Sequence, residues 1–156
     1  MTRSSERTGR SGEFAVCSWL SQHSDLVNLI PHGSHADIIF EYKDYLFKCQ
    51  VKTTTKQKKY ISKHTGRHYR SGWCWDLRRS SWSTNRAYEH KQIDLYAMYC
   101  KPKNKIVWIS ANSTKKSKIT FTDKALEDYD SLKGWNDSCE QAVNREFKFI
   151  KLSQKT

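Results

Sequence analysis

The chain has 156 residues, the size of one domain with its own hydrophobic core. Its 28 Lys and Arg against 16 Asp and Glu give a formal net charge of +12 and a pI near 9.6, which favours a polyanionic partner. An aromatic content of 13%, including six Trp, excludes a disordered basic tail. The lack of any apolar run of about 18 residues excludes a membrane-spanning helix.

The N-terminal half predicts a helix, a strand and a hairpin. Residues 1–10 are rich in Arg, Ser and Gly and predict a flexible basic arm. Apolar residues at three- and four-residue steps then predict a helix over 11–23, and the run DLVNLIP predicts a strand. HADIIFEY and YLFKCQVKT alternate in polarity on either side of Lys43 and Asp44, which predicts an antiparallel hairpin.

The C-terminal half predicts a second hairpin and a helical tail. Residues 53–72 are polar and basic and predict a loop or protruding flap. WCWDLRR predicts a strand, SSWSTNRAYEHKQ a connector, and IDLYAMYC with IVWIS a hairpin. Residues 122–144 predict helix interrupted near Gly134, with EFKFIKL as a last short strand. These elements predict a single α/β domain over residues 1–156 with a central sheet.

The five cysteines are an odd number, are scattered and include no C-x-x-C pair. This usage predicts reduced thiols, and the N-terminus MTRSSERTGR lacks the apolar segment of a secretory signal. We therefore expect a cytoplasmic protein.

The first hairpin sorts its side chains between two faces. With Lys43 and Asp44 in the turn, Asp37 faces Gln50, and a nearly continuous apolar set forms the core side. That set is Ile38, Phe40, Tyr42, Tyr45, Phe47, Cys49 and Val51. The opposite face brings Asp37, Gln50 and Lys52 together at the open end of the hairpin.

A carboxylate oxygen, an amide oxygen and an ammonium at one place suit metal-dependent phosphate chemistry. Mg²⁺ prefers oxygen ligands and is often held by one or two carboxylates and a phosphate. Lys52 could orient the nucleophile or stabilise charge that grows on the phosphate. The alternative is that Asp37 and Lys52 form a surface ion pair worth ~0 to 1 kcal/mol beside an uninvolved Gln.

The order of Glu13, then Asp37, then Gln50-Val51-Lys52 resembles the PD-(D/E)XK nuclease superfamily. More narrowly, SGEFAV, HADIIF, CQVKTT and QIDLYAMY resemble the branch of cyanobacterial-type group I intron homing endonucleases. The resemblance covers about residues 9–110. It implies a restriction-endonuclease-like α/β core, with a central mixed β-sheet flanked by helices, and a nuclease of a bacterial or phage-infected cell.

The resemblance also implies a site and a reaction. Glu13, Asp37, Gln50 and Lys52 would be the catalytic residues of a site-specific double-stranded DNA endonuclease, with Asp37, Gln50 and Glu13 as ligands of Mg²⁺ or Mn²⁺. The chain departs from the superfamily pattern at Gln50, where an acid usually stands, and at Ala36, where a proline does. Cutting both strands requires two related sites, so we expect a homo-oligomer, either a dimer or a tetramer.

Basic residues on both sides of this site predict the DNA-binding surface. Interleaved aromatic residues in the flap could reach base edges, although a solvated basic loop is the alternative interpretation. The predicted DNA-binding residues are Arg10, Ser11, Lys56, Lys58, Lys59, Lys63, Arg67, Arg70, Arg78 and Arg79. For Asp94, hydrogen bonding at a sheet end and proximity to the metal are both open.

Two other functions remain. Because an amide ligates a cation more weakly than a carboxylate, Gln50 is consistent with a nucleic-acid-binding module that has lost cleavage. The pairs His32 with His35 and His64 with His68 could contribute to a zinc site in an interaction protein, but no cysteine pair completes it.

Overall fold

The structure, a computed structural model, describes residues 2–31, 33–78, 93–114 and 117–154. In chain order the elements are α1 (Arg3–Leu20), β1 (Val27–Leu29), β2 (Ile38–Tyr42), β3 (Tyr45–Thr54), β4 (Lys58–Ile61), β5 (His68–Asp76), β6 (Leu95–Cys100), β7 (Lys105–Ser110), β8 (Lys118–Thr122), α2 (Asp123–Asp128) and α3 (Ser131–Gln154). No helix in these ranges is long and apolar enough to cross a membrane.

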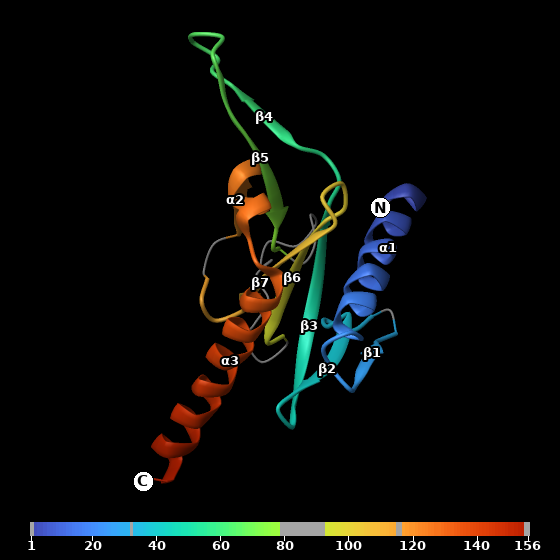
Figure 1. Cartoon of the computed structure of the whole chain (residues 1–156), viewed down its shortest axis with the longest axis vertical. Coiled ribbons are helices and arrows are strands. Elements are labelled where there is room, and N and C mark those ends of the chain that lie inside the picture. Colours follow the sequence, from blue (N-terminus) through green and yellow to red (C-terminus); the bar gives the residue numbers. More distant parts are fainter. Residues whose placement is uncertain (1, 32, 79–92, 115–116, 155–156) are drawn as a thin grey trace.

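The strands form two sheets. The central sheet has five strands in the order β1-β2-β3-β6-β7, with β3 and β6 parallel and the other pairs antiparallel. The smaller antiparallel sheet has the order β4-β5-β8. The expected α/β fold, with a central mixed sheet flanked by helices, is therefore confirmed (Figure 1).

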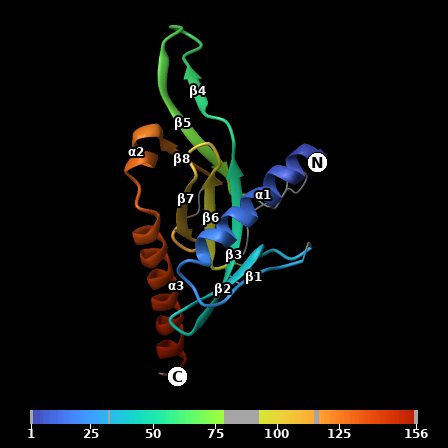
Figure 2. The same cartoon turned by 45° about the vertical axis from the view of Figure 1, so that its right-hand side comes forward.

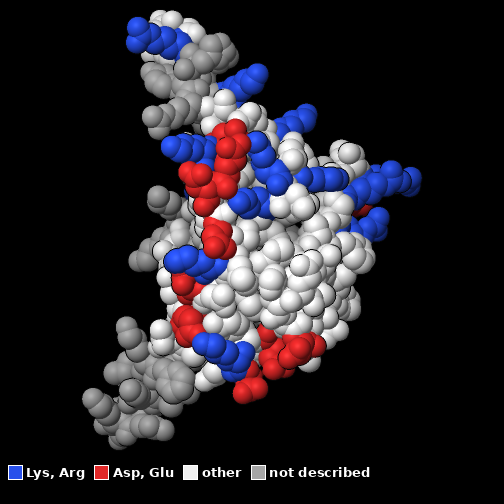
Figure 3. Space-filling model, in the orientation of Figure 1, with Lys and Arg blue, Asp and Glu red and all other residues white. Residues whose placement is uncertain are grey.

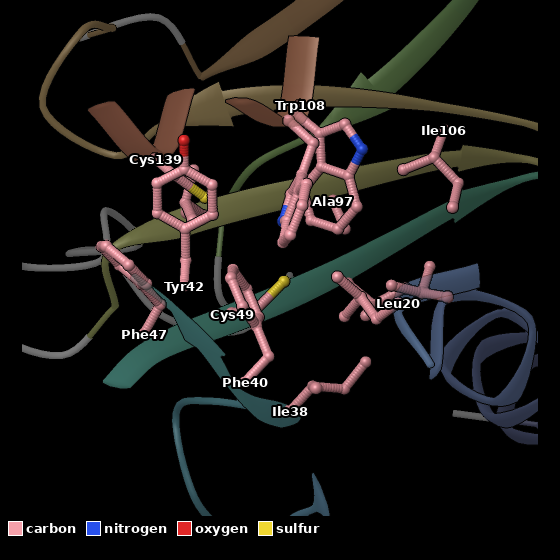
Figure 4. Close-up of a cluster of buried hydrophobic side chains, with 14 of the residues drawn as sticks. Leu20, Ile38, Phe40, Tyr42, Phe47, Cys49, Ala97, Ile106, Trp108 and Cys139 are labelled. Atoms are coloured by element: carbon pink, nitrogen blue, oxygen red, sulfur yellow. The ribbon is translucent and has the colours of Figure 1, made fainter. Parts of the chain in front are cut away.

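The two faces of the central sheet bury different clusters. Helices α1 and α3 pack on one face, where Leu20 and Trp135 meet Phe40, Cys49 and Trp108 (Figure 4). Strands β5 and β8 and helix α2 cover the other face, where Trp75 and Leu126 are fully or almost fully buried. The side chains of a strand in the central sheet can therefore pack into either of these two clusters.

The first hairpin has the predicted register. Ile39 pairs with Lys48 and Glu41 with Leu46, and the apolar set predicted for the core side is buried except for half-buried Tyr45. Lys43 and Asp44 have φ values of 47° and 67°. Two consecutive positive φ angles are what a two-residue turn with matching twist requires, so the turn conformation compensates for a weak turn sequence.

Helix α1 begins at Arg3, so residues 3–10 of the expected flexible arm over 1–10 are instead its first half. Thr2 caps the helix by accepting a 3.2 Å hydrogen bond from the Ser5 N–H, and Glu6 lies in the first turn. Arginine is among the better helix formers, so a run of basic charge did not prevent helix formation. The helix ends at Leu20, and residues 21–23 form a turn rather than its last part.

The flap is a β-hairpin. Strands β4 and β5 pair antiparallel and extend beyond the central sheet, at the top of Figures 1 and 2. Strand β5 also contains the predicted WCWD strand, and the predicted hairpin of IDLYAMYC and IVWIS corresponds to β6 and β7. The connector predicted over SSWSTNRAYEHKQ lies outside the described residues.

The C-terminal prediction was wrong in two places. The helix is interrupted at Tyr129 and Asp130 rather than near Gly134, and the segment EFKFIKL continues α3 instead of forming a strand. Gly134 lies inside α3. The position requires a residue without a Cβ, because the Tyr129 hydroxyl lies 1.8 Å from where an ideal Cβ would be. The short alternating run EFKFIKL fits both the period of a strand and that of a helix, and here it continues the helix that precedes it.

Candidate active site

Asp37 is fixed at the open end of the first hairpin. Its N–H donates to the Cys49 carbonyl at 2.8 Å, and its Oδ2 accepts from the Val51 N–H at 2.8 Å. The backbone of residue 37 thus continues the pairing beyond the last β2 partner, and the half-buried carboxylate lies over β3. These two bonds place Asp37 across from Gln50, as the sequence predicted.

Gln50 is 8% exposed, which is unusual for an uncharged amide without a role in the core. Its Nε2 donates to the Val51 carbonyl at 3.4 Å, so its Oε1 is directed away from that carbonyl. In the parallel register Gln50 pairs with Tyr96 of β6. The amide therefore lies on β3, the middle strand of the five-stranded sheet, between β2 and β6.

Lys52 is held by the second sheet. Its Nζ donates to the Arg78 carbonyl at 2.9 Å, just beyond the end of β5. Burial lowers the pKa of the Lys52 ammonium, while the carboxylates of Asp37 and Asp76 act in the opposite direction. The structure thus brings Asp37, Gln50 and Lys52 to the same end of the hairpin. The alternative of a surface ion pair does not describe this place, because Asp37 and Lys52 are both half-buried and each side chain has a backbone hydrogen-bond partner.

Glu13 comes from the other face of the sheet. It follows Gly12, whose ideal Cβ would lie 1.9 Å from the Thr53 Oγ1, so the backbone of α1 rests on β3 beside Lys52. The close approach, and not a phosphate, explains the glycine. Glu13 is half-buried and its charge helps to raise the pKa of Cys17 to about 11, after the larger effect of burial. Its place in the catalytic set remains a prediction.

The donor atoms at this place suit a hard cation. Asp37 and Gln50 offer a carboxylate oxygen and an amide oxygen, without sulfur or imidazole, which matches Mg²⁺ or Mn²⁺ better than zinc. Over the part of the chain that the structure describes, no group of three or more His, Cys, Asp and Glu residues is placed to hold a metal ion. Any metal here would therefore depend on the Gln50 amide as well as on acids.

Asp94 has a clear role in the sheet. Its N–H donates to the Lys48 carbonyl at 2.8 Å, and its Oδ2 accepts from the Lys48 N–H at 2.8 Å. Its own carbonyl accepts from the Ala111 N–H at 2.9 Å. The side chain thus completes the ladder at the end where β6 starts to pair with β3, which supports the sheet-end interpretation.

The predicted DNA-binding residues divide into three groups. Those on the start of α1 and along the flap are exposed, namely Arg10, Lys56, Lys58, Lys59, Lys63 and Arg67. In Figure 3 basic side chains spread over the upper part of the molecule and toward the start of α1, while acids run down the left side from the region of α2 to the lower end. The side chain of Arg70 and all of Arg79 lie outside what the structure describes.

Two residues of that prediction have intramolecular partners. The Arg78 guanidinium forms an ion pair with Asp76, with its Nε 2.8 Å from Oδ1, and this hydrogen bond lowers the Asp76 pKa to about 2. The Ser11 hydroxyl donates to the Thr8 carbonyl at 2.8 Å. Asp76 and the Arg78 carbonyl are site neighbours that sequence reasoning missed, since only the contact of two sheets reveals them.

The cysteines are free thiols, as expected, and three of them are buried. Burial is the largest cause that raises the pKa of Cys49 and Cys139, so neither is an activated nucleophile. Trp135 is 4% exposed and belongs to the core.

The comparisons with known proteins identify the family and the fold. The PD-(D/E)XK endonuclease family model matches residues 4–133. Among solved structures, the chain is similar to the bacterial homing endonuclease I-Ssp6803I, with a TM-score of 0.59 and 18% sequence identity over 90% of this chain and 97% of that one. No curated protein sequence matches. At this identity the structural likeness shows the fold, and the family model spans most of the sequence. The chain therefore belongs to the PD-(D/E)XK endonuclease family.

Proposed function

We propose that the protein is a metal-dependent endonuclease that cuts double-stranded DNA at a specific site, as a homing endonuclease does. Membership of an endonuclease family supports the phosphodiesterase activity, and the likeness to I-Ssp6803I supports the homing class. The observation that carries the proposal is the convergence of Asp37, Gln50 and Lys52 where β2 and β3 separate.

Each residue has a separate part in the proposed reaction. Asp37, Gln50 and Glu13 would hold Mg²⁺ or Mn²⁺, which supplies Lewis acidity and positive charge beside the scissile phosphate. The two backbone hydrogen bonds of Asp37 fix its carboxylate before any ligand binds. Lys52, anchored on the Arg78 carbonyl, would stabilise the negative charge that grows on the phosphate during attack by water.

The exposed basic residues of α1 and the flap would bind DNA. Phosphate contacts from lysine and arginine position a duplex, and a two-stranded ribbon fits the major groove, where base edges are distinguishable. A homo-oligomer would supply one site to each strand.

Cleavage of supercoiled plasmid carrying the DNA that flanks the gene tests the proposal. With Mg²⁺ or Mn²⁺ the protein should linearise the plasmid, and EDTA should stop it. Asp37→Ala and Lys52→Ala should bind DNA but lose cleavage by at least about a hundredfold, because each removes a group that acts on the reacting phosphate. Lys48→Ala is the matched control, on the same strand and four residues before Lys52, and should cut normally.

The second candidate is a DNA-binding module without cleavage, which Gln50 favours because an amide is a weaker ligand than a carboxylate. In that case the protein and all three variants would bind the plasmid and none would nick it. A Gln50→Glu variant that gained cleavage under the same conditions would identify residue 50 as the cause.

A further inference from the structure

The turn between β6 and β7 carries three lysines that point to different partners. Lys103 forms ion pairs with Asp123 at 3.4 Å and Glu127 at 3.2 Å. Lys105 donates to the Glu127 carbonyl at 3.1 Å and to the Tyr129 carbonyl at 2.6 Å. Both ammonium groups therefore bind helix α2 and the turn after it, where acids and carbonyls compensate their charge.

Lys101 faces the other way, toward the elements of the active site. Its N–H donates to the carbonyl of Thr54, the last residue of β3, at 3.0 Å. Its exposed Nζ lies 3.4 Å from the Ser11 Oγ on α1. Thr54 comes two residues after Lys52, or roughly 7 Å along an extended strand, and Ser11 comes two residues before Glu13. Lys101 thus bridges the two elements that carry the predicted catalytic residues.

The hydrogen bonds determine which group can donate to an anion here. The single O–H of Ser11 already donates to the Thr8 carbonyl, so toward Lys101 this hydroxyl acts as an acceptor. An ammonium has three N–H donors, and one bond to Ser11 leaves capacity for a phosphate oxygen. Arg10 and Lys56 are exposed on the same two segments and add positive charge.

We propose that Lys101 binds a backbone phosphate of the DNA next to the scissile one; of this pair the sequence-based prediction had named only Ser11 as DNA-binding. This inference rests on the proposed function. The backbone bond to Thr54 keeps Lys101 in fixed relation to Lys52, so the same phosphate contact also sets the register of the duplex over the catalytic residues.

The salt dependence of DNA binding tests the inference. Fluorescence anisotropy would measure the Kd for a labelled duplex of about 30 base pairs of mixed sequence, from about 50 to 200 mM KCl. Ca²⁺ would replace Mg²⁺ in these measurements to limit cleavage. Lys101→Ala should weaken binding and lower the slope of log K against log salt by about 0.9. The Kd ratio of variant to parent should then shrink about 3.5-fold across this range. Lys103→Ala, in the same turn and with the same charge change, should leave the slope unaltered, and Lys101→Arg should restore it.

Three results separate the outcomes. If the unaltered protein does not bind the duplex, the proposed function fails and this inference fails with it. If it binds and Lys101→Ala keeps the full slope, only the role of Lys101 is refuted. An equal loss of slope in Lys103→Ala would mean that net charge alone was measured, which also overturns the assignment. Circular dichroism and melting of each variant establish that it is folded.

Discussion

Replacing Gly12 with alanine tests the contact that places Glu13 beside β3. The new Cβ would lie 1.9 Å from the Thr53 Oγ1, 3.1 Å from its Cβ and 3.3 Å from its Cγ2. Rotating the threonine can move Oγ1 away, but the threonine Cβ stays within the tight range. The helix must therefore shift away from the strand, or the threonine must adopt a strained rotamer.

The size of the effect follows from two opposing terms. Overpacking of a filled contact costs about 1–3 kcal/mol, whereas alanine is favoured over glycine within a helix by about 1 kcal/mol. Gly9 is in the same helix with no atom within 4 Å of its ideal Cβ, so Gly9→Ala should gain the second term alone. The two variants should then differ in unfolding free energy by about 1–3 kcal/mol in urea titrations.

A double-mutant cycle isolates the contact. The Thr53 Oγ1 is buried and has no hydrogen-bond partner among the residues that the structure describes, so Thr53→Ala should cost little by itself. In the Gly12→Ala/Thr53→Ala variant the stability should recover, and so should any cleavage rate lost through displacement of Glu13. The reasoning is refuted if Gly12→Ala stabilises the protein as much as Gly9→Ala does.

Three further predictions concern the supports around the site. Asp94→Ala should cost about 1–3 kcal/mol in urea unfolding because it leaves the Lys48 N–H unpaired, whereas Asp94→Asn keeps an acceptor and should keep cleavage; loss of cleavage at normal stability would place Asp94 at the metal instead. Gly134→Ala should cost a similar ~1–3 kcal/mol, since its Cβ would overlap the Tyr129 hydroxyl, and an unchanged urea midpoint would contradict this. The Asp76 pKa is lowered to about 2 from an ordinary 3.8, so its ion pair stabilises the fold fully above pH 3.8 and progressively less as pH falls through 2; Asp76→Asn should lower the Tm at pH 7, and the difference should shrink below pH 3.8 and vanish only below pH 2.

The hairpin that carries the site was predictable because two physical constraints agree. A period of two fixes which side chains share a face, and a shift of one residue would turn Phe40 and Cys49 outward. The register then places Asp37 opposite Gln50 with no further information. That is why short-range patterns were enough to predict that Asp37, Gln50 and Lys52 lie at the same end of the hairpin.

The partners of Lys52 could not be predicted, because they come from a separate sheet. The Arg78 carbonyl and the Asp76 carboxylate reach this lysine only when β5 packs on the face opposite α1. That packing depends on contacts between residues far apart in sequence, such as the 3.1 Å hydrogen bond from the Trp75 indole to the Tyr99 carbonyl. Strand β8, which completes that sheet, has a weak apolar pattern and was missed. Long-range pairing of this kind leaves little trace in local sequence.

Strand β5 connects the flap to the Arg78 carbonyl that holds Lys52, and it changes pairing partner along its length. Gly72 pairs both with Lys58 of β4, in the flap, and with Thr122 of β8, in the body of the protein. A Cβ on Gly72 would come within 3.1 Å of the backbone of β8, so the strand is closely packed from this residue onward. Two buried tryptophans then anchor it before the Arg78 carbonyl accepts from Lys52. If the flap bends against DNA as proposed, we expect the bend to be absorbed before Gly72, while the Arg78 carbonyl that accepts from Lys52 stays fixed.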